Sequence, residues 1–366
     1  MKVPYTSFKK IISENKNQYS KKFLKTLEAG NYINGRECSK FEKNFAKYCN
    51  TLYSSGTSNG TCALRMGIEE LNFPKNSEII TPPNSFIAST SSIIKANLKP
   101  VFVDISNDWN MNVNLIESKI TKKTKAIMAV HLTGRPINME KVLKLAKKYN
   151  LVVIEDAAQS IGAKLNDQKV GSFGDFGCFS LHPLKNLFSF GDGGMIVSNN
   201  KSFIKKINIR KNHGLSSRDT CDYFSCNCRL DEIHASILNV QIKQIDKINR
   251  IKRKIAKIYN DNLGDYLKVP LEKKNEFHVY QTYIVFSEKR DKLQLYLKEK
   301  GIQTLVHYPI PIHLQPASKN LGYKRGSFPV AEKLSSEVLS LPSFVGMKDS
   351  QIDYVIKNIK KFYTRR

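Results

Sequence analysis

The chain has 366 residues, which is too long for one small hydrophobic core and suits a large domain with a smaller one. Hydrophobic residues make up 41% of it, as in ordinary globular proteins, and no apolar run reaches membrane-spanning length, so we expect no membrane partner. The N-terminal residues lack the apolar core of a signal peptide, and the expected location is cytoplasmic.

The formal net charge of +27 is compatible with a polyanionic partner or with the steering of a phosphorylated substrate. Lysines spread over solvated helix faces would produce the same total. The lysine-rich stretches at 247–257 and 357–361 contain no aromatic residues of the kind that stack on bases. We therefore expect no nucleic-acid partner.

The first half of the chain alternates between helical and extended patterns. Residues 8–29 are predicted to form a helix that Gly30 ends, and Ser39 with Glu42 has the spacing of a capping box at the start of the next helix. Short apolar runs that read as strands then alternate with helical stretches at 60–71, 86–97 and 138–149; these runs lie at 78–81, 101–103, 126–130 and 151–154. Such alternation predicts an α/β fold with a mainly parallel central sheet flanked by helices.

The second half changes character after a long helical stretch at 230–261. An alternating strand pattern at 280–286 and an amphipathic helix at 349–363 indicate a smaller α+β unit. We therefore expect a large α/β domain over residues 1–248 and a small C-terminal α+β domain over residues 249–366.

Ligands of open parallel sheets bind beyond the C-terminal ends of the strands, where Asp104, His131 and Asp156 are expected. Lys185 follows on a loop rich in Phe, Gly and Ser with few other charges. A lysine can form an imine with an aldehyde cofactor, and an acid can hold the ring nitrogen of that cofactor protonated. The alternative interpretation of Lys185 is an ordinary surface lysine. The alternative interpretation of Asp156 is a helix cap or an acid that faces water at the end of a strand.

Several weaker signals surround this pair. Residues 58–61, Ser-Asn-Gly-Thr, lie between a short strand and a helix, where backbone amides and a hydroxyl can hold a phosphate; an ordinary helix-capping turn is the alternative. Ser180 offers a second hydroxyl, and Phe86 is either a ring-stacking residue or a core aromatic. The glycine-rich stretch 171–177 has the wrong spacing for a dinucleotide loop.

Seven scattered cysteines argue against a disulfide scaffold. Cys221, Cys226 and Cys228, near His213, could suggest zinc, but their spacing is unusual and no fourth ligand is evident, so we expect no metal.

Collinear motifs along nearly the whole chain resemble the DegT/DnrJ/EryC1/StrS family of sugar aminotransferases, a branch of the fold-type I enzymes that depend on pyridoxal 5'-phosphate. The matching segments are SNGTCALRMGI (58–68), PVFVDI (100–105), VHLTGRP (130–136), IEDAAQSIGA (154–163), VGSFGDFGCFSLHPLKNL (170–187), GDGGMIV (191–197), RLDEIHASI (229–237), HYPIPIHLQPA (307–317) and LPSF (341–344).

The resemblance implies a role for each matching residue. Lys185 would form the imine with the cofactor, Asp156 would bind its ring nitrogen, and Gln159 would reach its ring hydroxyl. The phosphate would be held by Gly60, Thr61 and Ser180, with Phe86 packed on the ring. Asn227 would cross from the partner subunit to the phosphate, which implies a homodimer with shared sites, although Cys226 and Cys228 flank it where the family usually has aromatic or glycine residues. The implied substrate-side residues are His182, His307 and His313, the last with a structural role as its alternative.

The resemblance further implies transfer of an amino group from glutamate to a nucleotide-linked keto-sugar in surface polysaccharide or amino-sugar biosynthesis. The turn at 191–194 favours amination at carbon C3 of the sugar, whereas His182, which precedes Lys185, favours carbon C4. An eight-carbon keto-sugar acid as substrate, or a non-catalytic regulatory protein with the same fold, are the alternatives. A dehydratase is disfavoured because those relatives carry histidine where this chain has Lys185.

Overall fold

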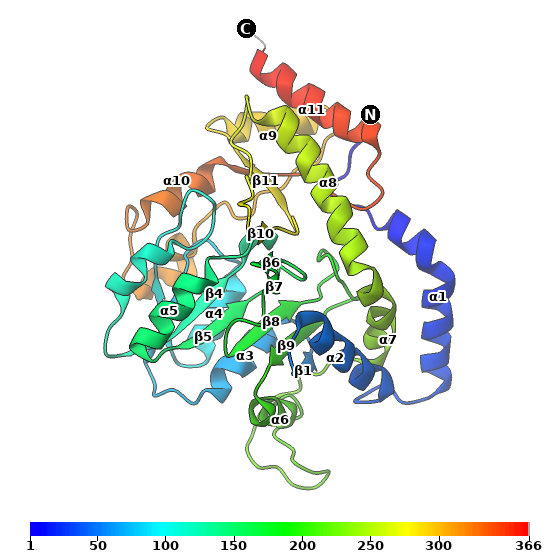
Figure 1. The fold of residues 1–366 in the computed structure, drawn as a ribbon, viewed down its shortest axis with the longest axis vertical. Coiled ribbons are helices and arrows are strands. Elements are labelled where there is room, and N and C mark those ends of the chain that lie inside the picture. The colour runs from blue at the N-terminus through cyan, green and yellow to red at the C-terminus, as the bar shows by residue number, and fades with distance from the viewer. Residues whose placement is uncertain (365–366) are drawn as a thin grey trace.

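A seven-stranded sheet forms the centre of the molecule in a computed structural model that describes residues 1–364 (Figure 1). The strand order is β1-β9-β8-β5-β4-β2-β3, and five neighbouring strands, from β8 to β3, run parallel. Strand β9 runs antiparallel to both of its neighbours. The strand bounds are β1 Tyr53–Thr57, β2 Glu78–Thr81, β3 Lys99–Phe102, β4 Thr124–Val130, β5 Val152–Asp156, β8 Phe176–Ser180 and β9 Gly194–Ser198. The predicted α/β fold is confirmed.

Helices cover both faces of this sheet (Figure 1). Those of the first two-thirds of the chain are α1 Lys9–Glu28, α2 Arg36–Cys49, α3 Gly60–Glu70, α4 Ile87–Lys95, α5 Met139–Tyr149, α6 Lys201–Arg210, α7 Glu232–Gln241 and α8 Ile245–Leu263. The stretch predicted as one helix at 230–261 is thus two helices, because residues 242–244 form a 3-10 turn between α7 and α8.

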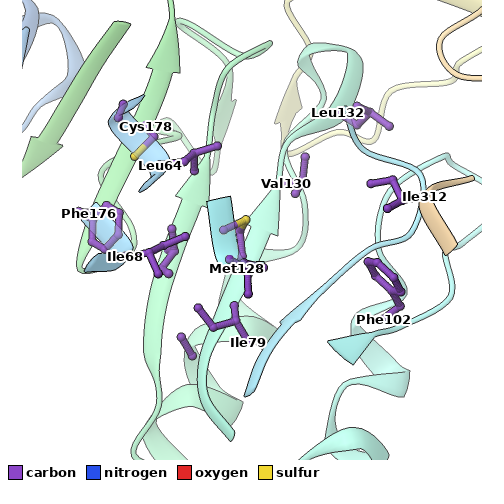
Figure 2. Packing of buried hydrophobic residues seen from close by; sticks show 14 of the residues in the cluster. Leu64, Ile68, Ile79, Phe102, Met128, Val130, Leu132, Phe176, Cys178 and Ile312 are labelled. Carbon is purple, nitrogen blue, oxygen red and sulfur yellow. The ribbon is translucent and has the colours of Figure 1, made fainter. Parts of the chain in front are cut away.

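Alternate residues of each strand pack against different helices, as the two-residue repeat of a strand requires. Phe176 and Cys178 of β8 lie in the same apolar cluster as Leu64 and Ile68 of α3, as Figure 2 shows, whereas Phe179 lies in the cluster that contains α2. Both faces of the central strands are therefore buried. This explains why the sequence shows them as continuous apolar runs rather than as an alternating pattern.

Helix α2 begins three residues before the predicted capping box. Ser39 lies inside the helix, where its hydroxyl donates to the Gly35 carbonyl at 3.0 Å. The first amide groups of the helix are instead bound by the carboxylate of Glu232, which accepts from the backbone of Gly35, Glu37 and Cys38 at 2.8–2.9 Å. The prediction was wrong because an acid from a distant helix satisfies the free amides that a local cap would otherwise bind.

The C-terminal part of the chain forms a smaller unit around a two-stranded antiparallel sheet. Its elements are β11 Tyr283–Phe286, α9 Arg290–Glu299, α10 Pro329–Glu337, β12 Val338–Leu341 and α11 Asp349–Thr364. The N-terminus joins this unit, because Val3 packs in its apolar cluster and bridges Ile302 (Figure 1). The domain division at residue 248 stays a prediction; α8 runs across that position.

A third, small sheet joins β6 Lys164–Leu165, β7 Gln168–Lys169 and β10 Glu276–Phe277, and so links the two parts of the chain. Among residues 1–364 no helix is both long enough and apolar enough to cross a membrane.

Candidate active site

Asp156 is the last residue of β5, and its side chain is only 5% exposed. Its Oδ2 accepts a 2.6 Å hydrogen bond from the Ser89 hydroxyl of α4, and its Oδ1 accepts from the Ala158 amide at 3.2 Å. Burial raises the pKa of Asp156, while the hydrogen bonds from Ser89 and Ala158 and the charge of Lys185 oppose that rise. The carboxylate is therefore fixed in position, and it needs a positive partner.

Lys185 lies on the loop between β8 and β9, in the wall of the same cavity as Asp156. Its backbone amide donates to the His182 carbonyl at 2.9 Å, which closes a tight turn. Loss of hydration lowers the pKa of the Lys185 amine to about 8, although the charge of Asp156 acts in the opposite direction. A larger fraction of this amine is therefore uncharged near neutral pH than for an ordinary lysine, and the uncharged amine is the nucleophile.

Gln281 holds the backbone on both sides of Lys185. Its Nε2 donates to the Leu184 carbonyl at 2.7 Å, and its Oε1 accepts from the Asn186 amide at 2.9 Å. The Asn186 side chain in turn donates to Asn249 and to the Val279 carbonyl. Lys185 is thus positioned by contacts with α8 and with the segment that precedes β11.

We expect Gln281→Leu to lower the turnover rate about tenfold and to destabilise the protein by about 1–3 kcal/mol, because two backbone groups lose their partner. Steady-state rates and thermal unfolding measure the two effects. Gln168→Leu is the matched control, since Gln168 binds Ser172 on the surface, away from the cavity. Unchanged kinetics in Gln281→Leu would contradict the positioning role.

The N-terminus of α3 has the geometry that a phosphate-binding turn requires. The Asn59 side chain caps the helix by accepting from the Cys62 amide at 2.8 Å. The amides of Gly60 and Thr61, at the first two helical positions, have no acceptor within the helix and are free for an anion. A side chain at residue 60 would meet Ser180 Cβ at 3.0 Å, so glycine permits this close approach of α3 to β8.

One cavity of about 660 Å³ brings most of the predicted residues together. Its walls include Gly60, Thr61, Phe86, Asp156, Gln159, Ser180, His182, Lys185 and His307. Gln159 donates to the Tyr308 hydroxyl at 3.1 Å, and the Phe86 and Tyr308 rings lie 5.7 Å apart. Phe86 is 52% exposed at this wall, which favours the ring-stacking interpretation over a core position.

Three residues that were predicted to lie in the site do not line this cavity. His313 is buried against Glu332, with a 2.9 Å contact between Nε2 and Oε1, and does not line the cavity, so the structure favours its structural alternative. Asp104 accepts from the amides of Val330 and Ala331 and so caps α10 rather than facing a ligand. Asn227 is exposed on the segment between α6 and α7 and reaches no cavity residue within one chain.

His131 lies in the cavity wall but is held by the protein. Its Nδ1 accepts from the Ile137 amide at 3.1 Å, so Nε2 carries the proton and donates to Glu155 at 3.0 Å. The Glu155 carboxylate also accepts three amides of the glycine-rich stretch, from Gly171, Phe173 and Gly174. That loop therefore binds a buried carboxylate of its own chain and not a phosphate.

The sequence reasoning missed four polar residues of the site: Ser89, Lys252, Gln281 and Tyr308. Lys252 is 7% exposed in the cavity wall, donates to the Gln281 carbonyl at 2.8 Å, and has its pKa lowered to about 7 by burial. Of the four, Tyr308 lies within the matching segment 307–317, next to His307. The others lie on helices or strand ends whose patterns gave no sign of chemistry.

No group of three or more His, Cys, Asp or Glu side chains within the described part of the chain could hold a metal ion. Cys221 is exposed and separate, with its thiol directed to the carbonyls of His213 and Tyr223. Cys226 and Cys228 gather instead around Cys62.

A loop lysine and a strand-end aspartate share one cavity with a helix N-terminus suited to a phosphate, and this arrangement defines the fold-type I class of transferases that use pyridoxal 5'-phosphate. The residues fit the cofactor: an amine for its aldehyde, a carboxylate for its ring nitrogen, free amides for its phosphate, and an aromatic face for its ring.

The sequence model of the DegT/DnrJ/EryC1/StrS aminotransferase family matches residues 13–360, and the chain belongs to this family. It is 37% identical to a dTDP-3-amino-3,6-dideoxy-alpha-D-galactopyranose transaminase of Aneurinibacillus thermoaerophilus, covering 98% of this chain and 99% of the relative. It is 38% identical to a pleiotropic regulatory protein of Geobacillus stearothermophilus, with 99% of each chain covered. The crystal structure of S. venezuelae DesV in complex with a ketimine intermediate superposes with a TM-score of 0.97 at 31% identity, covering 100% and 99% of the chains.

These matches confirm the predicted family, fold class, enzyme class and cofactor: the chain is an aminotransferase that depends on pyridoxal 5'-phosphate. The roles of the individual site residues stay predictions.

Proposed function

We propose that this enzyme transfers an amino group from glutamate to the keto group of a nucleotide-linked sugar. The observation that carries the proposal is the placement of Lys185, Asp156 and the α3 N-terminus around one cavity. The relatives named as sugar transaminases support the substrate class. The net charge of +27 suits a substrate that carries a diphosphate.

Bound pyridoxal phosphate supplies an aldehyde that receives the amino group and a ring that takes up the electrons released when the substrate Cα loses its proton. The negative charge of Asp156 would keep a proton on the ring nitrogen, and the Ser89 hydroxyl holds this buried carboxylate in place. Lys185 Nζ takes the proton from the Cα of the donor, and Gln281 holds its backbone in place. Thr61 and Ser180, with the Gly60 amide, hold the phosphate, and Gln159 reaches the ring hydroxyl.

We place the new amine at C3 rather than at C4. The glycine turn at 191–194 favours this position, and the printed name of the Aneurinibacillus relative specifies a 3-amino sugar. His182 and His307, which line the cavity, are the proposed sugar-side residues. Roles in surface polysaccharide or amino-sugar biosynthesis and a cytoplasmic location stay predictions.

The direct test incubates the enzyme, cofactor and glutamate with a panel of nucleotide-linked 3-keto and 4-keto sugars, together with an eight-carbon keto-sugar acid. Mass spectrometry and NMR identify the amino product and its position. We expect amination of a nucleotide-linked 3-keto sugar. Amination of the eight-carbon acid alone would support the alternative substrate, and absence of any amino product would contradict the proposal.

A purely regulatory protein is the second candidate, and the name of the Geobacillus relative motivates it. Retention of a buried Asp156 and a Lys185 with a lowered pKa is unnecessary for regulation alone. A gel-shift assay at physiological salt separates the two, because DNA binding without any amination of the panel would favour the regulator.

We also propose that the enzyme is a homodimer in which Asn227 completes the partner's phosphate site. Part of the segment between α6 and α7 extends away from the body of the chain (Figure 1), and Asn227 lies toward the C-terminal end of this segment. Phe224 on the same segment is fully exposed, as expected of a residue that a second copy would cover.

Mixing two weakened variants tests this sharing. We expect Lys185→Ala and Asn227→Ala to be poorly active alone and to regain activity after joint unfolding and refolding, because one site of the hybrid then has both residues intact. Turnover is measured against each variant refolded alone. If Asn227 served its own subunit, every site of the hybrid would carry a defect and no activity would return.

The pH dependence of cofactor attachment follows from the Lys185 pKa of about 8. The neutral amine is the nucleophile, so attachment to the apoprotein should become faster as the pH rises through this value and then level off. Because the Asp156 charge raises the Lys185 pKa, Asp156→Asn should shift the midpoint to lower pH. Stopped-flow absorbance across a pH series measures both, with Lys185→Ala as the blank; a shift to higher pH would contradict the coupling.

A further inference from the structure

Three thiols form a cluster beside the phosphate-binding turn, and the proposed reaction does not use them. Cys62 lies in the first turn of α3 and lines the cavity. Its sulfur is 2.9 Å from that of Cys228, which in turn is 3.4 Å from that of Cys226. All three are free thiols, and the last two come from the segment that follows α6.

Cys62 has the surroundings of a reactive thiolate. A hydrogen bond from the Cys228 thiol lowers the pKa of Cys62 to about 6; the Ser58 hydroxyl, the Arg65 charge and Asn59 add to this, and burial opposes it. The same contact raises the pKa of Cys228, which favours a negative charge on the Cys62 sulfur over one on the Cys228 sulfur. The position of Cys62 at a helix N-terminus also favours the thiolate.

Cys226 contacts Arg65 Nη2 at 3.0 Å but does not line the cavity, and four further cysteines lack this combination. Burial raises the pKa of Cys38, Cys49 and Cys178. Cys221 is exposed, but its thiol contacts only carbonyl oxygens. An oxidant that enters the cavity therefore meets one activated sulfur with a second thiol in contact with it.

We propose that Cys62 and Cys228 form a reversible disulfide in response to peroxide, and that this bond ties the segment carrying Asn227 to the phosphate-binding end of α3. The backbones already meet here, because the Ser58 amide donates to the Cys228 carbonyl at 3.2 Å. The bond therefore needs little movement of the chain.

The chemistry balances with hydrogen peroxide as the oxidant. The Cys62 thiolate attacks one peroxide oxygen; the O–O bond breaks, Cys62 becomes a sulfenic acid, and hydroxide leaves to become water. The Cys228 sulfur then attacks the Cys62 sulfur; the S–S bond forms, the S–OH bond breaks, and a second water leaves with the Cys228 proton. The two thiols are oxidised by two electrons, and a dithiol reductant reverses the change.

The cofactor and the disulfide are expected to compete. A phosphate at the α3 N-terminus would disfavour the neighbouring Cys62 thiolate and would restrict access through the cavity. Oxidation of the apoprotein should therefore be faster than oxidation of the cofactor-loaded enzyme. This comparison measures the rate of thiol oxidation and does not depend on which substrate is aminated.

The experiment treats the loaded enzyme and the apoprotein with hydrogen peroxide, blocks remaining thiols with an alkylating reagent, and maps peptides by mass spectrometry. We expect a Cys62–Cys228 linked peptide that lacks two hydrogens and disappears after dithiothreitol. Cys62→Ser and Cys228→Ala should both abolish that peptide, whereas Cys221→Ser should retain it. The paired variants keep the test informative if one of them folds poorly.

The proposal is overturned if Cys62 and Cys228 stay fully alkylatable after peroxide treatment, or if each is oxidised to a sulfinic or sulfonic acid without a link. A linked peptide that persists in Cys62→Ser would likewise contradict it, since the pair would then exclude Cys62. Failure of the enzyme to aminate any keto-sugar would leave this result unaffected.

Discussion

Replacement of Lys185 by alanine is expected to abolish turnover and the visible absorbance of the lysine-bound cofactor. The amine both attaches the cofactor and moves the substrate proton, so the rate should fall by roughly four orders of magnitude or more. The lysine cannot be replaced by a neighbour: Lys252 also lines the cavity, but it is bound to the Gln281 carbonyl. Turnover of glutamate with the accepted keto-sugar, together with an absorbance spectrum of the purified variant, measures the effect.

Lys169→Ala is the matched control for this variant. Lys169 is also a half-buried lysine whose pKa is lowered by burial, but it lies outside the cavity and donates to the Tyr48 carbonyl. We expect this control to keep its absorbance and its turnover. Lys185→Ala enzyme that aminates at the wild-type rate would remove the basis of the proposed mechanism.

Asp156→Asn is expected to lower turnover by roughly a hundredfold or more, because a neutral amide cannot keep the ring nitrogen protonated. The amide can still accept from the Ser89 hydroxyl, so the fold and the cofactor should be retained. Single-turnover kinetics of the glutamate half-reaction, with cofactor content measured in parallel, separate the loss of rate from loss of cofactor.

Asp246→Asn serves as the control, since Asp246 is an exposed aspartate that binds the Tyr48 hydroxyl away from the cavity. Ser89→Ala should give an intermediate loss, because Asp156 keeps its charge and loses one of its two hydrogen bonds. Equal rates in wild type and Asp156→Asn would show that the carboxylate has another role.

The sequence was informative where chemistry and periodicity coincide. The alternation of apolar runs with helical stretches predicted the parallel strands, and collinear motifs predicted the family, because both depend on local residue patterns. Asp156 and Lys185 are predicted because an acid stands out at the end of an apolar strand and a lysine stands out on a loop with few other charges. Their placement in one cavity follows directly from the strand order.

The sequence was less informative where distant segments meet. Ser39 with Glu42 satisfied the spacing of a cap, but nothing local shows that Glu232 takes that role. Asp104 follows β3 by two residues, much as Asp156 ends β5, but its carboxylate binds the start of α10. Gln281 is an ordinary glutamine in the sequence, and its importance depends on two backbone groups nearly a hundred residues away.

The contact between Glu232 and the start of α2 also determines when α2 becomes stable during synthesis of the chain. The start of α2 and its acceptor are separated by 197 residues, so α2 leaves the ribosome long before the group that binds its first amides exists. Until then the N-terminal turn of α2 has only water as a partner and frays, since a short helix gains most of its stability from tertiary contacts. Nascent chains that end before residue 232 should therefore expose this turn to proteases, and elongation through α7 should protect it.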